Sequence, residues 1–142
     1  MEPALAEILN LLLESERAGV AALDALSAEV APGELRQLLV TSRQDEMADA
    51  IGLEKLIRSS GVVPSQKVGT FAAKVAALGT LKERLQLLIH GEEWVARKVE
   101  EAIALAPPGG EVHEYLQKMA RRHRFEVEWG RAELIRLTNS LE

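Results

Sequence analysis

The chain has 142 residues and a formal net charge of −5; 47% of the residues are hydrophobic, 27% are charged, 4% are aromatic and none is cysteine. This length and composition are typical of one soluble helical domain over residues 1–142, and the negative charge argues against a general nucleic-acid binder. Without cysteine there can be no disulfide, thiolate metal site or cysteine nucleophile, so a bound metal would need oxygen and imidazole ligands.

Apolar residues recur at steps of three and four from Leu5 to Leu23, which predicts a first helix over about residues 4–28. Glu7 and Glu14 interrupt the apolar residues of this segment, so it resembles neither a secretory signal nor a membrane span. We therefore expect a cytoplasmic protein that does not bind membranes.

Pro32 and Gly33 break the apolar pattern before a second helix, which we expect over about residues 33–60. About 19 residues then separate this helix from the next long one. Within them, residues 70–78 (TFAAKVAAL) are typical of a short helix that ends at Gly79. This connection is therefore predicted to be ordered.

Thr80 followed by Glu83 is a capping-box signature and predicts the start of a third long helix, which continues to about residue 105. The PPGG run at residues 107–110 is the clearest break in the chain. A fourth helix is then predicted from about Val112 almost to the carboxyl terminus.

The connections predict how these helices are arranged. The first and last connections are only a few residues long, which favours antiparallel neighbours, whereas the middle connection is long enough to cross the length of a bundle. The sequence thus predicts an all-α four-helix bundle of two antiparallel hairpins joined by a long crossover. A plain up-down bundle with an enlarged middle loop is the alternative that remains open.

Each long helix has an acid or a histidine at mid-length in its apolar stripe. Glu16 belongs to the buried row because Leu12 lies four residues before it, and Glu46 and Asp49 share a face because they are three residues apart. At 1.5 Å per residue, all of these side chains lie at roughly the same height in the bundle. The six candidate ligands are Glu16, Glu46, Asp49, Glu92, His123 and Glu126.

Several ionised carboxylates in one dry layer would repel one another, and each would lose hydration worth roughly several kcal/mol. They must therefore be protonated, paired with cations or bound to metal, and a divalent ion is the most economical solution. Oxygen-rich ligands suit iron and manganese better than zinc. The alternative is a polar core layer whose acids are partly exposed or are neutralised by Arg17, Arg43, Arg97 or Lys98.

The bundle and its acids resemble the ferritin-like superfamily, whose members bind two metals through a carboxylate on helices one and three and Glu-x-x-His on helices two and four. The matching positions are Glu16 in LLESERAG, Glu46-x-x-Asp49, Glu92 in HGEEWVARK and His123-x-x-Glu126. Both paired motifs depart from the family pattern, and aligning Glu126 with the family glutamate places Trp129 at the histidine position. The segments RQDEMADAI and MARRHRFE are also similar to a small uncharacterised bacterial ferritin-like group.

The resemblance implies a ferritin-like metal-binding protein that holds iron or manganese, as one or two ions, at the six candidate ligands. It also implies oxygen- or peroxide-linked redox chemistry, such as ferroxidase activity. The second hypothesis is a metal-free interaction protein that uses the bundle as a scaffold around a polar core layer.

Phe125 and Trp129 lie four residues apart on the fourth predicted helix, so they form one apolar patch outside the inner stripe. We expect a homodimer through this patch, with Trp94 as a further contact, because two-fold pairing is the commonest closed assembly. We otherwise assign Trp94, Trp129 and Tyr115 to packing and give them no role in the site.

The remaining histidines, His90 and His113, fall beside the apolar stripes and are not expected to bind metal. The basic run at residues 121–124 (RRHR) surrounds His123. We expect its arginines to lie on a solvated face of the helix.

Overall fold

The computed structural model describes residues 1–140, so the last two residues of the predicted domain lie outside the described part. Within that part the chain forms helices only. The helices are α1 (Pro3–Glu29), α2 (Glu34–Ser59), α3 (Phe71–Ala76), α4 (Leu81–Leu105) and α5 (Glu111–Ser140).

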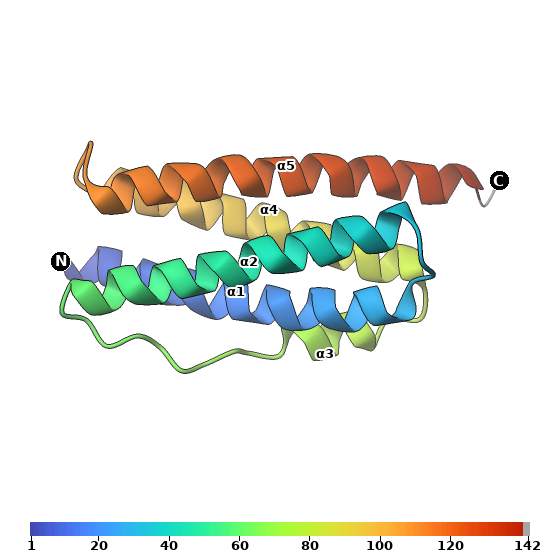
Figure 1. The fold of residues 1–142 in the computed structure, drawn as a ribbon, viewed down its shortest axis with the longest axis horizontal. Coiled ribbons are helices and arrows are strands. Elements are labelled where there is room, and N and C mark those ends of the chain that lie inside the picture. Colours follow the sequence, from blue (N-terminus) through green and yellow to red (C-terminus); the bar gives the residue numbers. More distant parts are fainter. Residues whose placement is uncertain (141–142) are drawn as a thin grey trace.

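The four long helices lie side by side, and the chain between α2 and α4 runs back along the whole bundle, with α3 on the outside (Figure 1). Because of this return, α4 begins at the end of the bundle where α2 also begins. The structure is therefore the predicted ferritin-like bundle of two hairpins and one long crossover. The plain up-down alternative is wrong.

Local chemistry explains where the helices begin and end. Pro3 lies in the first turn of α1, where its missing N–H leaves no helical hydrogen bond unmade. The hydroxyl of Thr80 accepts a hydrogen bond of 3.1 Å from the backbone N–H of Glu83, as the capping box predicts. The carboxylate of Glu83 accepts a bond of 2.9 Å from the same hydroxyl. Gly109 adopts a φ of 76° in the turn before α5, a conformation that favours glycine.

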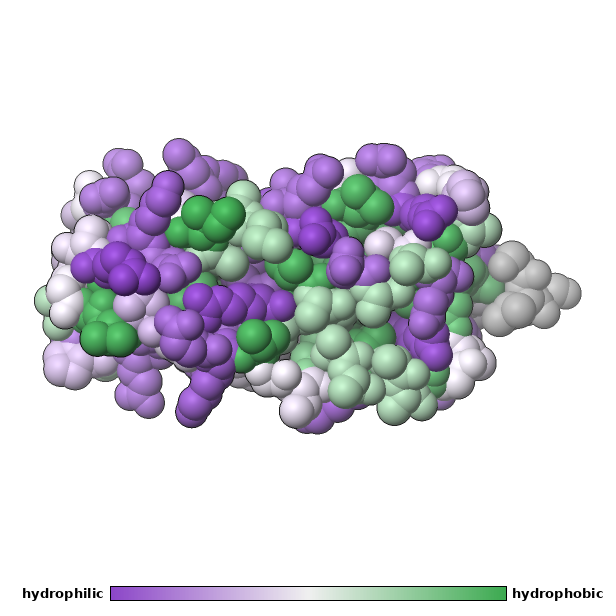
Figure 2. Space-filling model, turned by 60° about the horizontal axis from the view of Figure 1, so that its bottom comes forward, coloured by the Kyte–Doolittle hydropathy of each residue, from purple (hydrophilic) through white to green (hydrophobic). Residues whose placement is uncertain are grey.

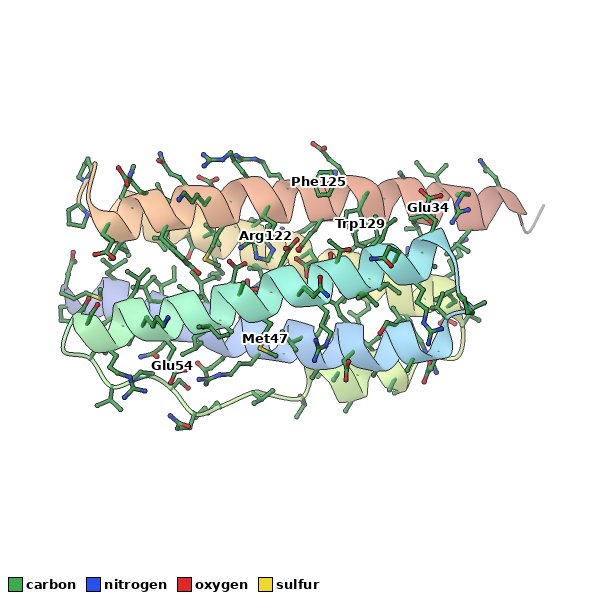
Figure 3. The ribbon with its side chains drawn as sticks, in the orientation of Figure 1. Glu34, Met47, Glu54, Arg122, Phe125 and Trp129 are labelled. Atoms are coloured by element: carbon green, nitrogen blue, oxygen red, sulfur yellow. The ribbon has the colours of Figure 1, made fainter. Side chains whose placement is uncertain are left out.

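Two buried apolar clusters lie on either side of the central polar layer. The first cluster includes Leu9, Leu53 and Leu116, and Tyr115 and Trp94 pack against it. The second cluster joins Leu23, Leu39 and Leu85 with neighbouring side chains, and Trp129 packs against it. The two hairpins meet mainly through α1 and α4, while α2 and α5 make few contacts. Side chains from all four long helices fill the space between the ribbons (Figure 3).

The surface around the crossover is mixed in polarity. Figure 2 shows this side of the molecule, where weakly hydrophobic residues gather over α3 and the carboxyl-terminal half of α1. None of the described helices has the length and hydrophobicity that a membrane span requires.

Candidate metal centre

The structure brings the six candidate ligands together in the layer between the two apolar clusters. None of them is more than 8% exposed, and Glu16 and His123 are completely buried. Each long helix contributes to the layer: Glu16 from α1, Glu46 and Asp49 from α2, Glu92 from α4, and His123 and Glu126 from α5. The helices are therefore not rotated so as to expose half of these acids to solvent.

His123 is in contact with carboxylates on both edges of its ring. Its Nε2 lies 2.7 Å from Glu16 Oε1 and its Nδ1 lies 2.6 Å from Glu92 Oε2, which are hydrogen-bond distances. Glu126 Oε2 lies 3.5 Å from Nδ1, and Asp49 Oδ2 lies 4.0 Å from Nε2. The imidazole therefore lies within 4.0 Å of one acid from each long helix. Glu46 is the one acid of the layer that is not among them.

The donor atoms form two groups that share His123. One group contains Glu46, Glu92, His123 and Glu126, and the other contains Glu16, Asp49 and His123. Within each group the donor atoms lie within 4.8 Å of one another. A neutral imidazole has only one free lone pair, so His123 can serve only one of the two groups at a time.

Several of the carboxylate oxygens are buried without a hydrogen-bond partner in the described part of the chain. They are one oxygen each of Glu16, Glu46 and Asp49 and both oxygens of Glu126. An unpaired buried acceptor is costly, and a buried unpaired charge is more so. A cation among these oxygens would supply the missing interactions, so the buried histidine and carboxylates fit a metal site.

Without metal, the acids differ strongly in protonation. Burial and the negative charge of Glu92 raise the pKa of Glu46 well above its usual range and the pKa of Glu126 to about 11. Burial also raises the pKa of Glu16, although His123 acts in the opposite direction. Glu126 is therefore neutral at pH 7, and Glu46 and Glu126 must both be deprotonated to bind a metal ion.

Glu92 and His123 form the charged pair of the metal-free layer. Burial by itself would raise the pKa of Glu92, but the charge and hydrogen bond of His123 lower it to about 2. Burial opposes the charge on His123, but Glu16 and Glu92 raise the pKa of its imidazole well above the usual range. The imidazolium donates from Nδ1 to Glu92 and from Nε2 to Glu16.

A glycine on α1 makes room for one of the acids. A Cβ atom on Gly19 would lie 2.7 Å from Glu46 Oε1, closer than side-chain carbons are found. The absence of a side chain at Gly19 thus lets Glu46 extend from α2 past the backbone of α1. This contact could not be predicted from the sequence, because it depends on how closely two helices approach and not on periodicity.

Arg122 corrects the prediction that the arginines of the basic run are solvated. Its guanidinium forms an ion pair with the buried carboxylate of Asp49, whereas Arg121 and Arg124 are exposed as predicted. A signal was present in the sequence, since Arg122 lies three residues after Met119 and four before Glu126. The same spacing had placed other residues in the inner stripe.

The four cations proposed as alternatives to metal lie elsewhere. Arg17 pairs with Glu54, Arg43 with Asp24 and Lys98 with Glu101, and Arg97 is exposed. His90 is exposed and His113 is half-buried, and neither belongs to a donor group among the described residues. Arg122 is thus the cation that the structure places against the acid layer.

Comparisons with known proteins agree with this fold. A family model described as "Domain of unknown function (DUF6306)" matches residues 4–133. No curated protein matches the chain in sequence. The crystal structure of BfrA from M. tuberculosis is similar, with a TM-score of 0.86 and 18% sequence identity over 98% of this chain and 88% of that one.

Two further solved structures have the same fold. Rhodobacter capsulatus bacterioferritin, whose structure is described as having a metal-free dinuclear site and heme iron, matches with a TM-score of 0.82 and 17% identity over 100% of this chain and 89% of that chain. A ferritin-like, diiron-carboxylate protein from Bacillus anthracis str. Ames matches with a TM-score of 0.79 and 23% identity over 96% of this chain and 99% of that chain. At these identities the likeness establishes the fold alone.

Proposed function

We propose that this chain, which belongs to the DUF6306 family, is a ferritin-like metal-binding protein that holds iron in the buried acid layer around His123. The observation that carries this proposal is the set of buried carboxylate oxygens without hydrogen-bond partners beside an imidazole. The single-domain organisation over residues 1–142, the cytoplasmic location and the homodimer expected from the sequence are part of the same proposal.

The four-residue group of Glu46, Glu92, His123 and Glu126 would hold the first ion. Its oxygens include three that lack partners, and Nδ1 of His123 faces two of its carboxylates. On the other edge of the ring, Glu16 lies 2.7 Å from Nε2 and would accept a hydrogen bond from Nε2–H. Such a hydrogen bond fixes the tautomer in which Nδ1 is free to bind metal.

The second group, Glu16 and Asp49 with His123, would hold a second ion less readily. Arg122 already neutralises Asp49, and Glu16 is engaged by Nε2. We therefore propose one ion per chain as the resting content, with the full set of six ligands used only if Arg122 moves away from Asp49.

Iron is the metal that the comparisons support, because the structural neighbours are described by a dinuclear site, heme iron or diiron-carboxylate chemistry. Manganese is supported only by the oxygen-rich donor set. Bound iron would supply one-electron redox chemistry toward dioxygen or peroxide, in an oxidoreductase or a ferroxidase-like protein. The chain's own contribution is to supply the buried carboxylates and to keep the imidazole in one orientation through its contact with Glu16.

The second candidate function is the metal-free scaffold. It is favoured by the charged contacts that the layer makes by itself, namely the imidazolium of His123 between Glu16 and Glu92 and the pair of Arg122 with Asp49. These contacts neutralise part of the layer, and burial together with hydrogen bonds to Glu92 contributes to the raised pKa values of Glu46 and Glu126 in the metal-free state.

Elemental analysis of protein purified without chelator tests the proposal. We expect about one iron per chain in the wild type and none in Glu46→Ala, Glu126→Ala or His123→Ala, because each loses a ligand and leaves uncompensated neighbours. Glu128→Ala is the matched control, since Glu128 is exposed on the same helix. Wild-type protein without metal after reconstitution with ferrous iron would support the scaffold. Unchanged iron in the three ligand variants would show that the iron is bound outside this acid layer.

A further inference from the structure

A cavity of about 350 Å³ opens beside the acid layer between α1, α3 and α4. Two members of the four-residue donor group, Glu46 and Glu92, form part of its wall, while Glu16, Asp49 and His123 do not. Its volume lies within the roughly 300–1,000 Å³ that is typical of small-molecule sites. One half of the candidate metal centre is therefore accessible to a ligand and the other half is enclosed by protein.

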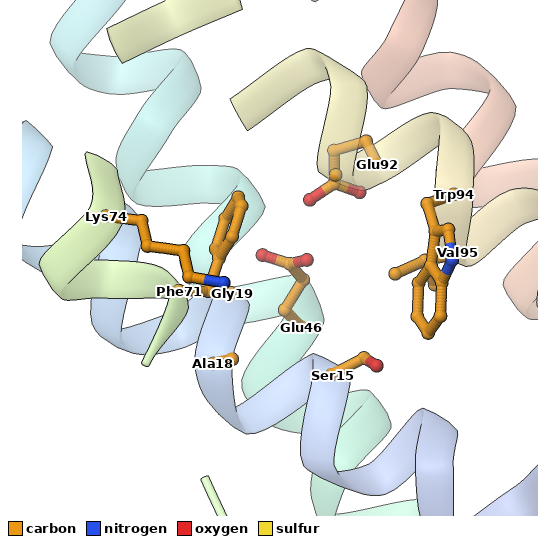
Figure 4. A pocket seen from close by; sticks show the side chains of 10 residues that line it. Ser15, Ala18, Gly19, Glu46, Phe71, Lys74, Glu92, Trp94 and Val95 are labelled. Carbon is orange, nitrogen blue, oxygen red and sulfur yellow. The ribbon is translucent and has the colours of Figure 1, made fainter. Parts of the chain in front are cut away.

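The rest of the cavity wall is mainly apolar. Figure 4 shows the carboxylates of Glu46 and Glu92 facing each other, with Phe71 on one side and Trp94 and Val95 on the other. Lys98 places its ammonium 5.6 Å from the centroid of the Trp94 ring, which helps to hold that ring in place. An apolar ligand body would thus lie between two aromatic rings.

The positive charge of the cavity comes from the crossover. Lys74 of α3 lines the cavity, and no ion pair joins it to an acid in the part of the chain that the structure describes. A wider hollow of about 690 Å³ adjoins the cavity, and its charged lining residues are Lys67, Lys74 and Glu14. A ligand that enters from this hollow therefore meets a positive charge before it meets the acid layer.

We propose that this cavity binds a small organic monocarboxylate, with its carboxylate at the ammonium of Lys74 and its apolar body between Phe71 and Trp94. In this orientation the carboxylate of the ligand pairs with a lysine that forms no ion pair in the described part of the chain, and its apolar body contacts the two aromatic rings. The inference names the substrate class of the proposed metal centre and rests on that proposed function. Binding itself needs only the cavity and Lys74.

The neighbouring glycines fit this assignment. A Cβ atom on Gly91 would lie 2.8 Å from the ring of Phe71, so glycine at this position lets Phe71 lie against α4 and form one side of the cavity. Gly19 similarly leaves space for Glu46 at the inner end. The cavity is therefore shaped by the same two helices, α1 and α4, that join the hairpins.

Backbone amide NMR titration of the full chain with benzoate tests the inference, with benzamide as a neutral probe of the same shape. We expect benzoate to shift the amides of Gly19, Phe71 and Gly91 in a saturable manner and to bind more tightly than benzamide. Lys74→Gln should weaken benzoate binding by roughly fivefold and leave benzamide binding unchanged, and Lys74→Arg should restore it. Lys55→Gln, which removes an exposed lysine away from the cavity, is the matched control.

The inference is overturned if benzoate and benzamide bind equally, if Lys74→Gln has no effect, or if the shifted amides lie elsewhere. Iron content is measured on the same samples, so the two proposals can fail separately. Saturable benzoate binding to a protein that takes up no iron would rule out the metal function and support the monocarboxylate site. Stoichiometric iron without benzoate binding would do the reverse.

Discussion

At the scale of single residues, Arg122 shows how one side chain can decide the metal content of the layer. Its guanidinium pairs with the carboxylate of Asp49, a buried residue that is only 3% exposed. A cation of the protein thus occupies the place in the charge balance that a second metal ion would take. Residue 49 is an aspartate where the ferritin-like pattern has a histidine, and this aspartate is the residue that Arg122 neutralises.

We predict that Arg122→Gln lowers the free energy of unfolding of the metal-free protein by about 1–3 kcal/mol, because it leaves Asp49 buried without a partner. The same variant should raise the iron content above one ion per chain, since Asp49 becomes free to bind a second ion beside Glu16. Denaturant unfolding and elemental analysis measure the two effects. Arg124→Gln, which removes an exposed arginine that pairs with exposed Glu100, should change neither; equal behaviour of both variants would contradict the role of Arg122.

At the scale of the elements, the sequence predicted the helices well because each is defined by local signals. The four long helices begin and end within about two residues of their predicted bounds, and the short helix of the crossover is α3 (Phe71–Ala76). The stripe positions of the five acids and the histidine also followed from the step of three or four residues. These features depend only on neighbours along one helix.

The features that the sequence did not predict depend on two elements at once. The contact of Gly19 with Glu46 and the cavity behind Phe71 both arise from the distance between packed helices. Periodicity cannot give that distance, because it describes which face of a helix is buried and not what lies opposite. Arg122 was misplaced for a related reason, since a residue at the border of a stripe can turn to either side.

The capping interactions give a prediction at this scale. We expect Thr80→Ala to lower the free energy of unfolding by about 1 kcal/mol, because the Thr80 hydroxyl accepts the backbone N–H of Glu83 at the start of α4. Thr70→Ala is the matched control, since Thr70 precedes α3 but makes no side-chain capping hydrogen bond. Urea unfolding of both variants measures the difference, and equal losses of stability would show that the cap of α4 contributes nothing.

At the scale of the whole molecule, the protons held by the acid layer should govern stability. In the folded metal-free protein the pKa of Glu126 is about 11, against a usual 4.5, and Glu46 and His123 are also shifted upward. The folded state therefore retains protons that the unfolded state releases as the pH rises above about 4.5. Glu92, with its pKa lowered to about 2, contributes stability that is lost only as the pH falls toward that value.

We therefore predict that, with chelator present, the free energy of unfolding decreases steadily from pH 5.5 to pH 9. Glu126→Gln should make this decrease smaller, because the variant removes one of the groups with a raised pKa. Added iron should stabilise the protein more at pH 8 than at pH 5.5, since metal binding requires deprotonated ligands. Urea unfolding at several pH values measures all three effects, and stability that is flat or rises over this range would contradict the assigned protonation states.

The proposed homodimer depends on apolar side chains that are exposed on α5. Phe125 on α5 is 61% exposed, whereas Trp129, one turn further on, is half-buried and packs against the second apolar cluster. In Figure 3, Trp129 lies on the side of α5 toward α2 and Phe125 lies on the outer part of the helix. The predicted patch thus has an exposed end and an end that belongs to the core, so Trp129→Glu would disturb folding together with any association.

Phe125→Glu is the better variant for testing the proposed homodimer. If two chains pair through this face of α5, a charge in place of an exposed phenyl ring would be buried without a partner at the two-fold axis, and the dimer should dissociate. Val63→Glu is the matched control, because Val63 is 83% exposed in the crossover, far along the chain from α5. Light scattering should give the mass of a dimer for the wild type and for Val63→Glu and the mass of a monomer for Phe125→Glu. A monomeric wild type, or a dimeric Phe125→Glu protein, would show that this face does not join two chains.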